Sequence, residues 1–185
     1  MRPFRFAALD FETASYERES ACALSIVIGE NDRIQTTWAR LIRPPRPTFL
    51  FTYLHGISWE DVRDQMTFGE LWPQINALLS GVDFLVAHNA SFDRGVMNAC
   101  CLHAGIPLLE KPYVCTVRVA RAVWNLRPTK LSDVCTYLNI PLNHHNALSD
   151  AQACARILLA AKNQGHDYTL LLKKHSLRKV KQPVQ

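Results

Sequence analysis

The sequence predicts an α/β domain with a mixed sheet of five strands and flanking helices. Three apolar segments of strand length occupy the first quarter of the chain, and strand-like and helix-like segments alternate after them. Three strands followed by strand–helix alternation are typical of an α/β domain with a mixed sheet. The chain has 185 residues, of which 48% are hydrophobic, and this is enough for one domain with a substantial core.

The first three predicted strands cover residues 4–11, 21–28 and 34–42. The first is apolar except for Arg5 and Asp10, as expected of a strand that is covered on both faces. A turn-like Gly-Glu-Asn-Asp segment separates the second strand from the third. Prolines then end this part of the sheet, because proline cannot donate to a strand ladder; they are Pro44, Pro45 and Pro47.

The first long helix is predicted to begin after Thr67. Thr67 and Glu70 have the spacing of a capping box, apolar residues follow at helical intervals, and Gly81 ends the pattern. The remaining expected elements are strands over residues 83–87 and 114–116 and helices over residues 91–104, 117–124, 131–138, 147–162 and 168–180.

Positive charge is concentrated at the end of the chain. The 21 Lys and Arg against 16 Asp and Glu give a net charge of +5, whereas residues 1–167 sum to zero. The excess comes from Lys173, Lys174, Arg178, Lys179 and Lys181. We therefore divide the chain into a domain over residues 1–165 and a basic tail over residues 166–185, which is either helical or disordered, and which either grips a nucleic-acid strand or keeps the protein dispersed.

Several classes of protein are excluded. No apolar run has the length of a membrane span, and Asp10 interrupts the N-terminus before a signal-peptide core forms. The six cysteines lack C-x-x-C spacing, which favours reduced, mostly buried thiols in a cytoplasmic protein. A zinc site at Cys100, Cys101 and His103 is disfavoured, because it places too many ligands in one short helical stretch. The glycines are too widely spaced for a phosphate-binding loop, and H-E-x-x-H and G-x-S-x-G are absent.

Carboxylates remain as the candidate chemistry. Asp10 and Glu12 end the first strand, where period-two alternation places both side chains on one face of the sheet. Asp93 follows the strand over residues 83–87 and begins a helix, and Asp150 begins the helix over residues 147–162. Four acids without a cysteine ligand favour a hard divalent ion, Mg²⁺ or Mn²⁺. Two such ions can stabilise the attacking and leaving oxygens of a phosphodiester displacement, and a histidine can take the proton from water.

Three segments of the sequence together resemble the motifs of the DEDDh family of 3′→5′ exonucleases. They are Asp10-Phe11-Glu12-Thr13, His88-Asn89-Ala90-Ser91-Phe92-Asp93, and His145 with four residues before Asp150. Leu54-His55-Gly56-Ile57 is similar to a further family segment. This group includes the epsilon proofreading subunit of bacterial DNA polymerase III, and the resemblance covers residues 5–161.

The resemblance implies a ribonuclease-H-like fold and release of nucleoside 5′-monophosphates from a 3′ end. It implies two Mg²⁺ ions per site, with Mn²⁺ as a substitute. Asp10 would bridge both ions, Glu12 and Asp150 would bind the first, and Asp93 would hold the second. His145 would be the general base. Thr13, His55 and Phe92 match positions that seat the terminal nucleotide. Phe11 is a further stacking candidate, although a core position is the commoner one for a phenylalanine in such a strand.

The adjacent histidines require a choice of register. Family spacing selects His145 as the base and leaves His144 as a plain polar loop residue. The sister class with tyrosine in the third motif would place that tyrosine at Asn146, so it is disfavoured. Asn146 also replaces the acid expected after paired histidines, which would alter the pKa of His145 without removing a ligand.

The substrate and partner stay open at this stage. DNA ends, single-stranded or frayed, are favoured, with an RNA-trimming enzyme of the oligoribonuclease type and a polymerase-associated proofreading or binding module as alternatives. Arg118 and Arg121 could meet phosphates, but a solvated helix face is the favoured interpretation. The apolar residues 49–53 are either a wedge at the rim of the site or packing against the helix after Thr67.

Overall fold

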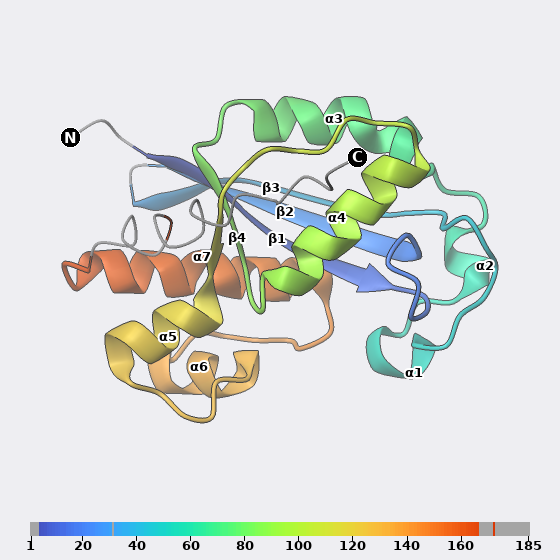
Figure 1. Cartoon of the computed structure of the whole chain (residues 1–185). Helices are drawn as coiled ribbons and strands as arrows, with labels where there is room; N and C mark the ends of the chain where they lie inside the picture. The colour runs from blue at the N-terminus through green and yellow to red at the C-terminus, as the bar shows by residue number, and fades with distance from the viewer. Residues whose placement is uncertain (1–3, 31, 167–171, 173–185) are drawn as a thin grey trace, which may run out of the picture.

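The predicted mixed sheet is present. The computed structural model describes residues 4–30, 32–166 and 172, and within them one five-stranded sheet has the order β3-β2-β1-β4-β5 (Figure 1). β1 pairs antiparallel with β2 and parallel with β4, which makes the sheet mixed. The strands are β1 (Arg5–Thr13), β2 (Ala21–Glu30), β3 (Arg33–Leu41), β4 (Phe84–Ala87) and β5 (Tyr113–Cys115).

The long helices lie where the sequence predicts them, with ends shifted by one or two residues. The capping box is confirmed, since Thr67 accepts from the Glu70 N–H and the Glu70 carboxylate accepts from the Thr67 N–H. These helices are α3 (Phe68–Ser80), α4 (Ser91–His103), α5 (Thr116–Trp124), α6 (Leu131–Leu138) and α7 (Ala147–Asn163). The sequence did not predict α1 (Thr52–His55) or α2 (Trp59–Val62), because four residues show no helical periodicity.

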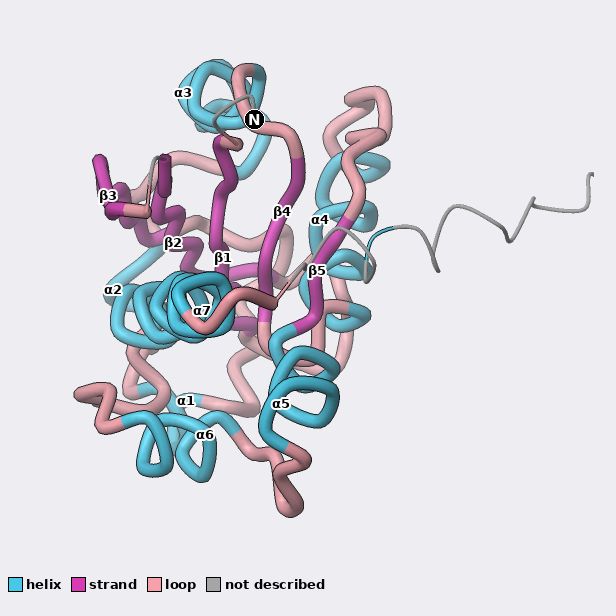
Figure 2. Tube along the Cα trace, turned by 90° about the vertical axis from the view of Figure 1, so that its left-hand side faces the viewer, coloured by secondary structure: helices cyan, strands magenta, loops and turns pink. Residues whose placement is uncertain are grey.

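The alternation along β1 divides the core into two layers. Ala7, Leu9 and Phe11 pack with α3 and α4, whereas Phe6 and Ala8 pack with α5, α6 and α7. The two layers of helices are visible on the two faces of the sheet (Figure 2). Asp10 and Glu12 therefore share the face that α7 covers, as period-two alternation predicts.

The segment after the prolines packs differently from one of the two expectations. Phe49 joins a small cluster around Ala14, Cys22 and Val62, with its ring centroid 6.5 Å from that of Trp59. It does not pack against α3. The reason is that the unpredicted α2 supplies Trp59 and Val62 as the apolar partners of Phe49, and no α3 residue belongs to this cluster of described residues.

The other expectations concern the cysteines, the membrane and the tail. All six cysteines are free thiols, and all except Cys115 are buried. Among the described residues, no helix combines the length and the apolar character needed to cross a bilayer. The helix expected over residues 168–180 and nearly all of the basic tail lie outside the described residues.

Candidate active site

Four carboxylates from three separate segments are electrostatic neighbours at one end of the sheet. Asp10 and Glu12 lie at the end of β1, whereas Asp93 and Asp150 lie in the first turns of α4 and α7. The backbone N–H of Phe11 donates to Asp93 Oδ1 at 3.2 Å, which ties the start of α4 to β1. Parallel pairing of β1 with β4 explains this meeting, because α4 starts just beyond the end of β4.

All four carboxylates have raised pKa values, and the charges of neighbouring carboxylates contribute to the shifts of Asp10 and Glu12. Burial raises the pKa of Asp10 well above its ordinary value, and the charges of Asp93, Asp150 and Glu12 raise it further. Burial, followed by the charges of Asp150 and Asp93, raises the pKa of Glu12 to about 8. Burial also raises the pKa of Asp93 to about 7, although the Phe11 N–H opposes the shift. Such a cluster is costly when ionised, so it favours a bound cation or bound protons.

Asp150 has one oxygen that is held and one that is not. Burial raises its pKa, and the hydrogen bond and charge of His144 oppose that shift. His144 Nδ1 lies 2.9 Å from Asp150 Oδ2, and the His145 N–H donates to the same oxygen at 3.3 Å. In the described part of the chain, Asp150 Oδ1 is buried and has no hydrogen-bond partner. A buried carboxylate oxygen without a partner is unfavourable unless another group completes it.

This donor set fits a divalent metal centre in its chemistry. Carboxylate oxygens are the ligands that Mg²⁺ and Mn²⁺ prefer, and the unpartnered Asp150 oxygen supplies a ligand with no other role in the described structure. Within the described ranges, however, no three His, Cys, Asp or Glu side chains converge closely enough to hold an ion as they stand. One oxygen of each of two carboxylates is held by a hydrogen bond, Asp93 Oδ1 by the Phe11 N–H and Asp150 Oδ2 by His144.

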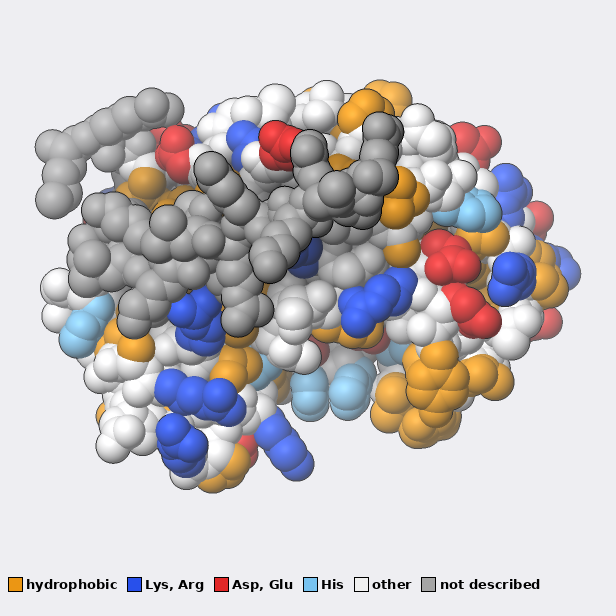
Figure 3. Space-filling model, in the orientation of Figure 1, with side chains coloured by type: hydrophobic (Ala, Val, Ile, Leu, Met, Phe, Trp, Pro, Cys, Tyr) orange, Lys and Arg blue, Asp and Glu red, His pale blue; other side chains and the backbone are white. Residues whose placement is uncertain are grey.

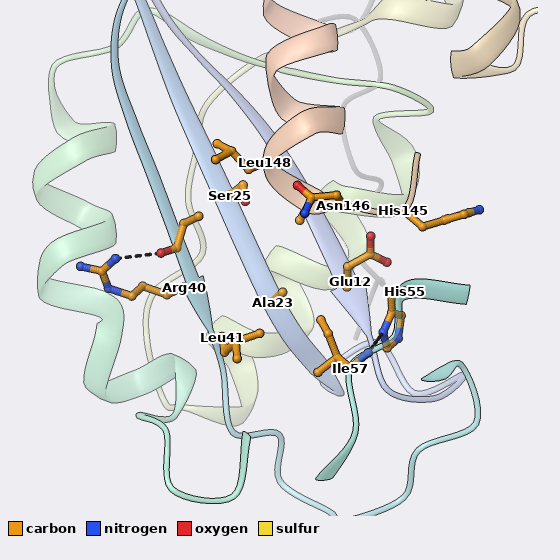
Figure 4. Close-up of a pocket in the computed structure, with 12 residues that line it drawn as sticks. Glu12, Ala23, Ser25, Arg40, Leu41, His55, Ile57, His145, Asn146 and Leu148 are labelled. Carbon is orange, nitrogen blue, oxygen red and sulfur yellow. Dashed lines mark hydrogen bonds between the residues drawn. The ribbon is translucent and has the colours of Figure 1, made fainter. Parts of the chain in front are cut away.

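The two histidines before α7 form a stacked pair. Their ring centroids are 4.0 Å apart with planes 15° from parallel. His145 has a φ of +64°, in the left-handed region, and its ring points away from Glu12 (Figure 4). His144, expected to be a plain loop residue, instead contacts Asp150 through its ring. The structure thus gives His144 a specific partner and leaves His145 exposed beside the carboxylates.

A pocket opens on the side of Glu12 that faces β2 and β3. It has a volume of about 290 Å³. Glu12, His55 and His145 form one side of it, and the small side chains of Ala23 and Ser25 on β2 form its floor (Figure 4). Of the four carboxylates, Glu12 is therefore the one that borders this pocket, which lies between α1 and the start of α7.

The proposed nucleotide-seating residues are placed differently from one another. His55 is fixed, because its Nε2–H donates to the Thr13 carbonyl at 3.1 Å and its Nδ1 accepts from the Ile57 N–H at 3.0 Å. Burial lowers the pKa of His55 and favours the neutral ring. Thr13 is almost buried, and Phe92, in the first turn of α4, is 38% exposed.

The stacking role considered for Phe11 is wrong. Its side chain is 3% exposed and lies in the core between the sheet and the α3–α4 layer. Residues 10 and 12 face α7, so residue 11 necessarily faces the opposite side of the sheet. A nucleotide at the carboxylates cannot stack on this ring.

Sequence reasoning assigned no role to His88, which the structure places between the carboxylate motif and α5. Its Nδ1 accepts from the Thr116 hydroxyl at 2.7 Å, and its Nε2–H donates to the Thr129 carbonyl at 3.0 Å. Burial lowers the pKa of His88 and keeps it neutral. The signal was available, since His88 directly follows β4 and lies five residues before Asp93, but its partners are distant in sequence.

Comparison with known proteins gives the family of the chain. Residues 7–158 match the family model described as exonuclease (RNase T). The chain is 31% identical to the PolC-type DNA polymerase III of Clostridium perfringens over 158 residues, which are 83% of this chain and 11% of that protein. It is 28% identical to the corresponding Thermotoga maritima protein, again over 83% of this chain and 12% of that one. The chain thus spans about one eighth of the length of these relatives.

Solved structures share the fold. The chain superimposes on exonuclease X in complex with 5′-overhanging duplex DNA with a TM-score of 0.74 and 23% identity, covering 92% of this chain and 98% of that one. It superimposes on the nuclease domain of 3′hExo, a DEDDh family member bound to rAMP, with a TM-score of 0.77 and 17% identity, covering 89% and 94%. For Escherichia coli exonuclease I with an oligonucleotide, the TM-score is 0.75 and the identity 16%, covering 94% and 44%. These matches have the ribonuclease-H-like architecture predicted for the chain.

Proposed function

Because the chain belongs to the exonuclease family, as a 3′→5′ exonuclease of the DEDDh type, we propose that it trims single-stranded or frayed DNA ends. Each cycle hydrolyses the last phosphodiester bond and releases a nucleoside 5′-monophosphate. The observation that carries this proposal is the group of four buried or partly buried carboxylates with raised pKa values, drawn from β1, α4 and α7.

The family implies divalent metal ions, and we assign their ligands to this cluster. Asp10 is the shared ligand, Glu12 and Asp150 complete one site, and Asp93 belongs to the second. Two Mg²⁺ ions, or Mn²⁺ in their place, would stabilise both the attacking and the leaving oxygen of the displaced phosphate. The unpartnered Asp150 oxygen and the raised pKa values of Glu12 and Asp93 support this assignment.

The protein's own groups then position the substrate and move the proton. His145, exposed beside the carboxylates, takes the proton from the attacking water, the role for which imidazole is the commonest side chain. Both ring nitrogens of His55 are engaged, by the Thr13 carbonyl and the Ile57 N–H, so His55 orients the terminal sugar by exchanging one of these hydrogen bonds. Phe92 offers an exposed ring on which the terminal base stacks.

DNA is the proposed substrate. The curated relatives are DNA polymerases, and two of the similar structures contain DNA. An RNA-trimming activity is the second candidate, because another similar structure contains rAMP. A polymerase-associated proofreading role is also a candidate, since the matched stretch is one part of a polymerase in the curated relatives; co-purification with a polymerase subunit tests it.

The experiment compares DNA and RNA of the same sequence, each labelled at the 5′ end, with Mg²⁺ and with EDTA. We expect a ladder that shortens by one nucleotide at a time from the 3′ end, faster for DNA, and abolished by EDTA. Faster loss of RNA would replace the substrate assignment. Loss of the 5′ label as a mononucleotide, or digestion in EDTA, would contradict the proposal.

A further inference from the structure

The connection between α5 and α6 carries positive charge that the proposed chemistry does not use. Residues 113–132 contain four basic side chains and no acidic one. Arg121, Arg127 and Lys130 are exposed; we call these three residues the α5–α6 basic surface. The first acid after them, Asp133, accepts the Lys130 N–H at 2.8 Å and caps α6.

The charge of the three residues of this surface is not neutralised within the described structure. None of the three side chains forms an ion pair with a described residue, whereas Arg43, Arg46 and Arg63 each have an acidic partner. The single side-chain hydrogen bond among them runs from Arg121 to the Thr129 hydroxyl at 3.1 Å. A concentrated, unpaired positive surface is the usual footprint of a polyanionic partner.

The surface is fixed to the active site by His88. The His88 ring makes hydrogen bonds with the Thr129 carbonyl and the Thr116 hydroxyl. His88 also lies close enough to His144 for the charge of His144 to lower the pKa of His88, after the larger effect of burial. Lys130 follows Thr129 directly, and Arg121 contacts the same residue. The basic surface is thus one hydrogen bond away from the segment that carries Asp93.

The walls on the two sides of the site differ in chemistry. On one side, around α1, the exposed side chains are apolar: Leu50, Tyr53 and Leu54. On the other side, Lys and Arg gather over α5 and α6, with histidines between the two walls (Figure 3). Thr13 and His55, which seat the terminal nucleotide in the proposed function, adjoin the apolar wall. A strand seated there and leaving on the opposite side would pass over the basic surface.

We propose that the α5–α6 basic surface binds the phosphate backbone of the substrate strand on the 5′ side of the bond that is cut. The proposal rests on the proposed function for the direction of the strand, but its binding test does not require catalysis. It predicts that Arg127 and Lys130 determine affinity for long strands and its salt dependence. It also predicts that they leave the chemical step on the terminal nucleotide unchanged.

The test compares the double variant R127Q/K130Q with the wild type and with a control, R33Q/R63Q. The control removes two exposed charges outside the active-site pocket, one at the far end of β3 and one after α2. Binding of a 5′-fluorescein-labelled 12-nucleotide thymidine strand is measured by anisotropy in EDTA, from 50 to 200 mM salt. Each lost phosphate contact on a single strand makes the negative slope of log K against log salt about 0.7 less steep. The slope for R127Q/K130Q should therefore be about 1.4 less steep than that of the wild type. Over this range its affinity should fall about sevenfold less than that of the wild type.

A second readout separates the surface from the active site. Hydrolysis of thymidine 5′-(p-nitrophenyl phosphate), which has no upstream phosphates, should be equal in the wild type and in R127Q/K130Q with Mg²⁺. KM for the 12-nucleotide strand should rise about tenfold while kcat is unchanged. An unchanged salt slope, or an equal loss on the small ester, overturns the proposal. A wild-type protein that binds the strand with the full slope but hydrolyses neither substrate overturns the proposed function and leaves this surface supported.

Discussion

Glu12 is the residue whose titration reports the state of the carboxylate cluster. Burial and the charges of Asp150 and Asp93 raise its pKa to about 8. Between its ordinary value of 4.5 and this one, the folded protein retains a proton that the unfolded chain has released. The stability supplied by this proton is complete below pH 4.5 and is lost as the pH rises toward 8.

In EDTA, the melting temperature should therefore fall as the pH rises from about 5 to about 8, and Glu12→Gln should remove much of the fall. The expected difference between the wild type and this variant at pH 8 is about 3 °C or more, the change that 1 kcal/mol produces in a domain of this size. Glu60→Gln, an exposed change on α2, is the control and should follow the wild type. A wild-type melting temperature that rises over this range would show that the carboxylates are not mutually destabilising.

The stacked histidines make separate predictions. His145→Ala should lower kcat by roughly 10²–10⁴-fold, the effect of losing a general base, while the KM for the strand changes little. His144→Ala should have a smaller effect on kcat, because His144 contacts Asp150 Oδ2 and orients that carboxylate. His144→Asn, which can still donate to the carboxylate, should restore part of the loss. If His144→Ala were the more damaging change and His145→Ala harmless, the two roles would have to be exchanged.

At the scale of elements, the first turn of α7 positions Asp150. Asn146 is the N-cap of this helix, and its side chain accepts from the Ser149 N–H at 3.1 Å. The same turn holds the loop that carries both histidines, because the Asn143 N–H donates to the Ser149 hydroxyl at 2.8 Å. Asn146, which stands where an acid was expected, is therefore the N-cap of α7.

Asn146→Ala should lower the free energy of unfolding by about 1 kcal/mol, the usual cost of losing an N-cap. Asn146→Asp should keep that stability, because an aspartate also accepts the bond and suits the positive end of the helix. Urea unfolding of the two variants in EDTA measures the difference. Equal loss in both variants would mean that the cap does not hold this helix end.

The elements that the sequence predicts well are those with a strong local pattern. The capping box at Thr67 and the alternation along β1 predicted α3 and the face that Asp10 shares with Glu12. In contrast, α1 and α2 are single turns without periodicity. The partners of His88, Thr116 and Thr129, lie 28 and 41 residues away in sequence. No local pattern could indicate those contacts, which depend on how α5 and α6 pack.

At the scale of the whole molecule, topology concentrates negative charge at one end of a chain that is positive overall. Asp10, Asp93 and Asp150 are distant in sequence, but β1 lies between β2 and β4, and α7 crosses its face. The net charge is +5, and two divalent ions at the four carboxylates would bring it to +9. A site that repels phosphate when empty would then no longer repel it.

The central claim is that these carboxylates hold the ions that hydrolysis requires, and Asp10→Asn tests it most directly. Asn matches Asp in size and is neutral. Burial and three neighbouring acids already favour the neutral form of the Asp10 carboxyl. The melting temperature of the Asp10→Asn variant in EDTA should therefore equal or exceed that of the wild type. Asp64→Asn, a change at an exposed acid paired with Arg63, is the matched control.

The measurement is the rate at which each protein trims a 5′-labelled single strand in Mg²⁺. We predict that the trimming rate of Asp10→Asn is at least about 10³-fold below that of the wild type, because several kcal/mol of transition-state stabilisation disappear with the shared ligand. Asp64→Asn should trim at the wild-type rate. A folded Asp10→Asn protein that trims as fast as the wild type would contradict the central claim.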